Sequence, residues 1–355
     1  MADVSPFRAY RYSSKAGRLE DLVTQPYDKI SPAMRERYLS LNPYNLVRII
    51  LGEKSSADSA GDNVYTRAAR HFREWCELGI FEQDAEPAFF AYFQEFDEPD
   101  TGERLLRKGF IGLGAVEDYS AGVVHRHEQT LSGPKADRLE LLRHVRTHFG
   151  QIFMLYPDPE GRVDSVLDRA AAGPPLAEVA DEYGAVHRLW RIADAGRIAA
   201  IREAMARKKL IIADGHHRYE TALAFRNENP ELAGARRVMM TFVNMDSPGL
   251  RILATHRLVD RADAPALVEA LGVSFRVREA ASLDALRAAW SEPHAGRIRL
   301  GVAGAGRLWL VEAPREPGQL DVPFLHERIL RDVLGIGAEE VRDEKRIRYV
   351  RGAEA

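Results

Sequence analysis

The sequence predicts a mixed α/β fold of the α+β kind, on three observations. Stretches with apolar residues at helical spacing alternate with short apolar or alternating stretches that are typical of strands. Proline, glycine and asparagine separate these stretches. The 355 residues, 45% apolar and 29% charged, have an ordinary globular composition but exceed the usual size of one hydrophobic core. We therefore expect two domains, or one core with a large insertion.

In the N-terminal part, Ser31 and Pro32 form a typical helix start, with the serine as the cap. The only cysteine, Cys76, cannot form an intramolecular disulfide, and its helical spacing predicts a place on a buried helix face. The expected elements are a helix from Ser31 to Asn42-Pro43, a strand over 46–51, a helix over 65–78, and an antiparallel hairpin of strands 89–96 and 110–116.

The middle of the chain is predicted to hold a helix around Leu141 to Phe149 and then a strand over 152–156. Residues 157–175 are polar, small and proline-bearing, which favours a linker or an insertion point. After them we expect a strand over 186–192, a helix capped by Asp194, a buried strand over 210–213, a helix that ends at Asn229-Pro230, and a strand over 238–245.

In the C-terminal third, Gly304-Ala305-Gly306 is interpreted as a hairpin turn and not as a dinucleotide-binding loop, because no helix follows it. The elements predicted there are a helix near 265–271, an alternating strand over 273–277, a helix capped by Ser282, and hairpin strands over 298–302 and 308–311.

The run from Asp214 to Arg218, Asp-Gly-His-His-Arg, joins a predicted buried strand to the next helix. Such a junction places backbone N–H groups and the positive end of the helix dipole at one point, which attracts anions. Gly215 lets the backbone approach a phosphate, and Arg218 can bind it with two hydrogen bonds. His216 and His217 add donors whose charge depends on pH. The sequence therefore predicts a phosphate-binding loop.

Asp214 is not expected to bind phosphate directly. Its carboxylate fits a role in holding a Mg²⁺ ion that bridges phosphates, or in orienting one of the two histidines. The competing interpretation is a plain turn in which the histidines satisfy buried backbone groups. Two adjacent histidines and an arginine at a strand-to-helix turn argue against that interpretation.

A second polar cluster, His125 to Thr130, contains Glu128 and lies in a connection before a helix. It is polar enough to form a site, although such runs are also common on solvated surfaces. Four further charged residues are weaker candidates for substrate binding: Asp28, Arg48, Lys135 and Arg138. Lys135 and Arg138 follow the polar cluster, and Asp28 and Arg48 could line a cleft next to it. The alternative for all four is a structural role, in surface ion pairs or in turns.

Composition limits the partners. Fifty basic against 53 acidic side chains give a net charge of -3, so the chain lacks the basic surplus that duplex nucleic acid usually requires, and we expect no DNA partner. No stretch approaches the roughly 18 apolar residues of a membrane helix, and the N-terminus has no signal-like run. We expect a cytoplasmic protein without membrane contact, and an oligomer is possible.

Several short runs are distributed over nearly the whole chain: Pro6-Phe7-Arg8, Pro26-Tyr27-Asp28, Asn42-Pro43-Tyr44-Asn45, His127-Glu128, Lys135-Ala136-Asp137-Arg138 and Ile212 to Ala222. With these runs the sequence resembles the bacterial and archaeal family called domain of unknown function ten-fifteen. Members of that family continue past Arg346 to Val350 into a motif with proline and lysine, so we expect any site residue of that motif to be missing.

More remotely, His127 to Leu223 is similar to the ParB and sulfiredoxin superfamily, and within it to free-serine kinases with an Asp-Gly-His-x-Arg loop. In those kinases the loop holds nucleotide phosphates, and an upstream glutamate, which matches Glu128, takes the proton from the serine hydroxyl. The resemblance implies an N-terminal α/β region over 1–120, a ParB/sulfiredoxin-like phosphate-binding core over 121–250 with an insertion at about 158–207, and a C-terminal α/β region over 251–355.

These interpretations lead us to expect a nucleotide-dependent phosphotransferase that acts on a small hydroxyl compound. Serine or its phosphate is the best candidate, and the enzyme could run as a kinase or in the reverse direction. Glu128 would be the general base, Asp214 and His217 would complete the catalytic set, and Mg²⁺ with ATP or ADP would be required. A metal-dependent hydrolase is the first alternative, with zinc or manganese ligands drawn from His125, His127, His216, His217 and His256. A non-catalytic nucleotide-responsive switch is the second.

Overall fold

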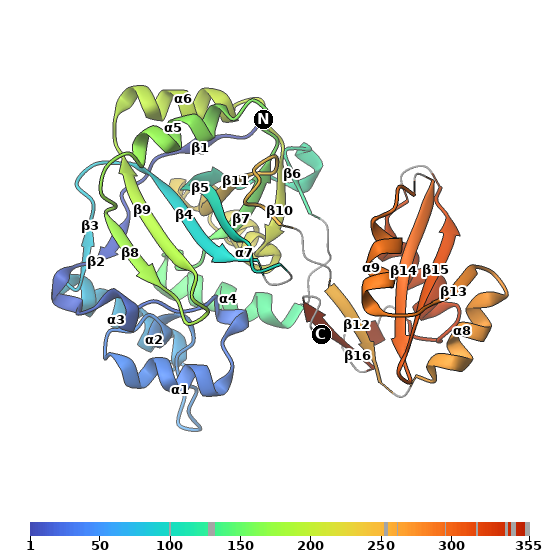
Figure 1. The fold of residues 1–355 in the computed structure, drawn as a ribbon. Helices are drawn as coiled ribbons and strands as arrows, with labels where there is room; N and C mark the ends of the chain where they lie inside the picture. Colours follow the sequence, from blue (N-terminus) through green and yellow to red (C-terminus); the bar gives the residue numbers. More distant parts are fainter. Residues whose placement is uncertain are drawn as a thin grey trace. The chain divides into compact units, whose positions relative to one another are not determined.

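The computed structural model describes residues 1–98, 101–126, 132–251, 255–260, 262–294, 296–316, 319–337, 340–341 and 346–351. The chain divides into two compact units, Met1–Ile252 and Leu253–Ala355. Both units combine helices with sheets, so the predicted mixed α/β class is confirmed (Figure 1). Strands from regions 1–120 and 121–250 of the sequence share one sheet in the first unit.

The first unit is built on a mixed sheet. Its strands are β1 Val4–Ser5, β4 Phe89–Asp97, β5 Arg104–Ala115, β6 Val124–His125, β7 Ile152–Tyr156, β8 Ala177–Ala180, β9 Val186–Ile192, β10 Leu210–Asp214 and β11 Arg237–Asn244. Among the described residues the order is β6-β10-β7-β11-β5-β4-β9-β8, with β1 added beside β5. β6 is parallel to β10 and β7 to β11, and the other neighbours are antiparallel.

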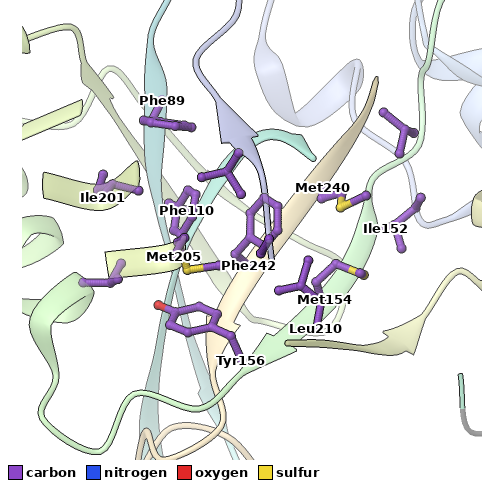
Figure 2. Packing of buried hydrophobic residues seen from close by; sticks show 14 of the residues in the cluster. Phe89, Phe110, Ile152, Met154, Tyr156, Ile201, Met205, Leu210, Met240 and Phe242 are labelled. Atoms are coloured by element: carbon purple, nitrogen blue, oxygen red, sulfur yellow. The ribbon is translucent and has the colours of Figure 1, made fainter. Parts of the chain in front are cut away.

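The main core lies on one face of this sheet. Helices α5 (Arg162–Ala170) and α6 (Ala195–Met205) cover that face (Figure 1). Figure 2 shows Ile201 and Met205 of α6 beside aromatic side chains of the strands, among them Phe89, Phe110 and Phe242. Burial of this apolar surface, at about 25 cal/mol per Å², supplies the main driving force for the fold.

The rest of the first unit consists of the N-terminal segment and more helices. These are α1 Pro32–Leu41, α2 Val47–Ile50, α3 Val64–Glu77, α4 Ser132–Val145 and α7 His216–Glu228, together with the short strands β2 Tyr10–Tyr12 and β3 Phe81–Gln83. Helix α7 contributes Tyr219 and Ala222 to the main core. A second cluster joins α3 to α4, where Trp75 packs with Leu141 and Val145. The remaining short 3₁₀ helices are Ser14–Ala16, Leu19–Asp21, Tyr27–Lys29, Tyr119–Ala121 and Ala233–Arg236.

Most predicted elements are present, including the Ser31 cap, the β4–β5 hairpin and the strand β7. The predicted strand over 46–51 is wrong, because the Asn45 side chain accepts from the Val47 amide and starts the short helix α2. Of the two possibilities predicted for 157–175, the linker is also wrong, and the insertion point stays a prediction. The segment contains α5, started by the Asp158 carboxylate, which accepts from the Val163 amide at 3.0 Å.

Two smaller corrections concern single residues. Cys76 is only partly buried, because the buried face of α3 is formed by Ala68, Ala69 and Trp75. The strand predicted over 273–277 begins later, at β13 Arg276–Ala280, because Val273 and the residues after it form the turn that closes the preceding helix.

The second unit has two small sheets. One pairs β12 Thr255–Val259 with β16 Ile347–Arg351, and the other has the order β13-β15-β14, with β14 Arg297–Gly304 and β15 Arg307–Pro314 forming the predicted hairpin. Its helices are α8 Ala264–Gly272, α9 Leu283–Ser291, α10 Asp321–Phe324 and a π-helical segment Leu325–Arg331. Arg299 and Glu312 form a buried ion pair at 2.8 Å within it. No helix in the described part of the chain is long and apolar enough to cross a membrane.

Candidate functional site

The turn from β10 into α7 has the geometry that the sequence predicts. Gly215 occupies the N-cap of α7 with φ 91° and ψ 30°, a left-handed conformation that favours glycine. A register shift between Ile212 and Asp214 interrupts the pairing of β10 with β7 and re-aims the end of the strand. Because glycine has no side chain, the N-cap residue of α7 cannot cap the first amides of the helix.

Arg218 is the best-defined polar group of this turn. Its Nη2 donates to Asp214 Oδ2 at 2.5 Å, and its Nη1 donates to the carbonyl of Gln151. Gly150 and Gly215 flank the side chain, since a Cβ built on either would lie 3.1 Å from it. Two contacts leave three of the five N–H donors of the guanidinium without a protein acceptor among the described residues.

Asp214 and Arg218 line a cavity of about 970 Å³. The cavity lies between the sheet and the N-terminal segment, and Tyr27, Arg138 and Gln151 also line it. A volume of this size is in the range of small-molecule and nucleotide sites, whose walls are mostly apolar with a few polar groups. The strand-to-helix turn therefore faces a space that can hold a ligand.

The chain matches the family described as "Protein of unknown function (DUF1015)" over residues 4–325. The chain belongs to this family. No curated protein and no solved structure matches it.

Other predicted residues of this DUF1015 protein are distributed unevenly around the cavity. Arg138 lines it, stacks 4.3 Å from the Tyr27 ring centroid, and donates to the Ile50 carbonyl. Burial raises the pKa of Tyr27, and the nearby guanidinium groups of Arg138 and Arg218 oppose that rise. Asp28 is exposed beside Tyr27, whereas Arg48 donates to the Leu39 carbonyl at 2.9 Å, away from the cavity lining.

Two described residues that border the second polar cluster contact the same helix. β6, which ends at His125, runs parallel to β10. Arg126 and Lys135 both form ion pairs with Glu220 of α7, at 3.5 and 2.5 Å. His127 and Glu128, which lie between them in sequence, are outside the described residues. The described residues on either side of Glu128 are therefore held against α7.

The two histidines of the turn differ in burial. His216 is buried at 2% exposure, whereas His217 is half-buried, and neither lines the cavity. Among the described residues there is no group of three His, Cys, Asp or Glu side chains that could hold a metal. The single carboxylate of Asp214, half-exposed beside the cavity, is the described group at the turn that suits Mg²⁺.

Sequence reasoning missed several polar groups of the cavity. His148 lines it, and burial lowers the pKa of His148 to about 4, so this imidazole is neutral at physiological pH. On the sheet, Arg107, Gln94 and His187 also line the cavity. In β4 the sequence carries a signal for such a row, because Tyr92 and Gln94 are polar residues at alternate positions of an otherwise largely aromatic strand. The segments around Arg107 and His187 carry no such alternation.

Proposed function

We propose that this protein is a nucleotide-dependent phosphotransferase acting on a small hydroxyl compound. The observation that carries the proposal is the pairing of Asp214 and Arg218 at a glycine-capped helix start that faces a cavity of about 970 Å³. The guanidinium has three donors left for phosphate oxygens, and the helix dipole favours negative charge at the same point.

The donor set at the turn suits Mg²⁺. Asp214 uses only Oδ2 in its ion pair with Arg218, and Mg²⁺ is commonly held by one or two carboxylates together with phosphate oxygens and water. When bound there, the ion would neutralise charge on the phosphates.

In the proposed reaction, the acceptor hydroxyl oxygen forms a bond to the terminal phosphorus of the nucleotide. The bond from that phosphorus to the bridging oxygen breaks, so ATP leaves as ADP, or ADP leaves as AMP. The hydroxyl proton moves to the Glu128 carboxylate, the base that the similarity to serine kinases suggests. Arg218 holds phosphate oxygens throughout. Arg126 and Lys135, which lie on either side of Glu128 in the sequence, form ion pairs with Glu220 of α7.

Serine is the proposed acceptor, with phosphoserine as the phosphate donor in the reverse direction, and a ParB/sulfiredoxin-like core is the proposed evolutionary setting. Both proposals rest on the similarity of the Asp214 to Arg218 run to the loop of free-serine kinases. Phosphoryl transfer needs positioning and charge stabilisation more than covalent help, so a phosphate loop, Mg²⁺ and one carboxylate form a sufficient set.

Phosphorus NMR tests the proposal directly. The protein is incubated with Mg²⁺ and either ATP or ADP plus serine, and separately with AMP or ADP plus phosphoserine. A phosphoserine resonance that grows with loss of the nucleotide donor, or the reverse exchange, is expected. Nucleotide binding without turnover on any small hydroxyl compound would favour a non-catalytic switch, and absence of nucleotide binding would refute the proposal.

A further inference from the structure

A row of polar side chains crosses three neighbouring strands on the cavity side of the sheet. Gln94 of β4 lies opposite Arg107 of β5 and, on its other side, opposite His187 of β9. Phe90 and Leu189 on the same face belong to an apolar cluster. Polar groups on the inward face of a sheet cost free energy unless they are hydrogen-bonded or bind something.

The hydrogen bonds in this row run in one direction. Arg107 Nε donates to Gln94 Oε1 at 2.9 Å, which leaves Gln94 Nε2 to donate to His187 Nδ1 at 3.3 Å. Since Nδ1 accepts, and also accepts from the Tyr92 hydroxyl at 2.7 Å, the proton of the neutral ring is on Nε2. His187 Nε2 then donates to Asp181 Oδ2 at 3.2 Å. Because a guanidinium can only donate hydrogen bonds, Arg107 fixes the direction of all the hydrogen bonds in this row.

This arrangement holds Arg107 by its Nε and leaves its outer groups unused. Nη1 and Nη2 have no acceptor, and no carboxylate pairs with Arg107, within the part of the chain that the structure describes. The guanidinium lies 5.2 Å from the ring centroid of Phe96 and 5.4 Å from that of Phe153. Burial lowers the pKa of Arg107, yet a guanidinium stays charged at neutral pH. A largely desolvated, unpaired cation that lines a cavity is typical of a binding site.

Arg107 is also close to the phosphate loop through one side chain. Phe153, which stacks on Arg107, lies opposite Asp214 in the β7–β10 pairing. Arg107 and Asp214 line the same cavity. A small molecule that binds beside Asp214 therefore has the outer amino groups of Arg107 as its next charged partner on the sheet.

We propose that Nη1 and Nη2 of Arg107 bind the carboxylate of the acceptor, so that the substrate is a small hydroxy or amino acid and not a simple alcohol or sugar. The inference rests on the proposed function and specifies the substrate class of the same site. The planar, two-donor edge of a guanidinium matches a carboxylate, and the Nε contact with Gln94 holds that edge in place before binding.

The test compares phosphoserine with phosphoethanolamine, which has the same phosphate and amine but no carboxylate. Calorimetry measures both ligands on the wild-type protein, on Arg107→Gln and on Arg104→Gln. Arg104 is a matched control, since it lies on β5 but pairs with Glu95 and Asp97 at the exposed edge, outside the cavity lining. Thermal melting shows whether each variant is folded.

The wild type and Arg104→Gln are expected to prefer phosphoserine by about tenfold to hundredfold, the usual worth of a charge-assisted pair. Arg107→Gln is expected to lose this preference and to keep its affinity for phosphoethanolamine. If Arg107→Gln does not fold, Arg107→Lys, which keeps the charge but not the Gln94 contact, is expected to show a reduced preference.

The proposal would be overturned by a wild type that does not bind phosphoserine or does not prefer it. It would also be overturned by a folded Arg107→Gln or Arg107→Lys protein that keeps the full preference. An equal loss of affinity for both ligands would overturn it as well, because Arg107 would then bind the phosphate that the ligands share. Titration with ATP or ADP and Mg²⁺ separates this inference from the proposed function. Preference for phosphoserine without nucleotide binding would refute the phosphotransferase and leave the carboxylate site standing.

Discussion

Replacing Arg218 with alanine tests the phosphate loop most directly. The side chain is 14% exposed and holds two acceptors, the Asp214 carboxylate and the Gln151 carbonyl. The Asp214 carboxylate is 45% exposed, so water and ions can solvate it after the arginine is removed. Loss of this ion pair should therefore lower the free energy of unfolding by only about 0 to 1 kcal/mol. The Gln151 carbonyl loses a charged donor, which costs about 1 to 2 kcal/mol. We expect a folded protein with a somewhat lower melting temperature.

Ligand binding should fall more than stability does. Loss of a charge-assisted contact to phosphate is worth about 1.5 to 3 kcal/mol, so the affinity for ATP or ADP with Mg²⁺ should fall about tenfold to hundredfold. Gly150 and Gly215 flank the arginine side chain, so neither residue offers a side chain that could replace it in the alanine variant. Isothermal titration calorimetry measures the change.

Arg226→Ala is the matched control. Arg226 is on the same helix, is 19% exposed, and also binds one carbonyl and one aspartate, those of Val116 and Asp118. It does not line the large cavity. Both variants should lose similar stability, and only Arg218→Ala should lose nucleotide affinity. A folded Arg218→Ala protein that binds nucleotide as the wild type does would refute the phosphate loop.

Three further predictions follow from the site. Glu128→Gln should lower turnover about a hundredfold or more at unchanged nucleotide affinity, measured by steady-state rates and calorimetry; wild-type turnover would shift the role of base to Asp28 or Asp137. Gly215→Ala should lower the free energy of unfolding by about 1 to 2 kcal/mol and weaken nucleotide binding, because φ at Gly215 is 91° and the new Cβ would lie 3.1 Å from the Arg218 guanidinium. Chemical denaturation measures the change, and a variant as stable as the wild type would contradict the prediction. Burial lowers the pKa of His148 in the folded protein to about 4, below its unfolded value, so the folded state binds fewer protons than the unfolded state. The free energy of unfolding should therefore fall as the pH drops from 6.5 towards 4, by up to about 3 kcal/mol. Denaturation of His148→Gln at several pH values should show a weaker pH dependence.

The sequence determined the local elements of the site well. The strand before Asp214, the turn at Gly215 and the helix after it were predicted because hydrophobic spacing and glycine chemistry act over a few residues. The structure differs from the prediction over 46–51 and within 157–175, where the side chains of Asn45 and Asp158 accept hydrogen bonds from the first-turn amides of the helices α2 and α5.

Which residues share the cavity was decided only by the tertiary structure. Asp214 and Arg218 of the predicted site line it, but His216 is buried elsewhere, and Arg48 lies outside the lining. Arg107 lies before the predicted strand 110–116, and its hydrogen bond to Gln94 depends on the register between β4 and β5. That no acidic side chain among the described residues pairs with it depends on the strands around it in the sheet. Spacing along the sequence reports which face a side chain occupies, whereas the register between strands reports what that face meets.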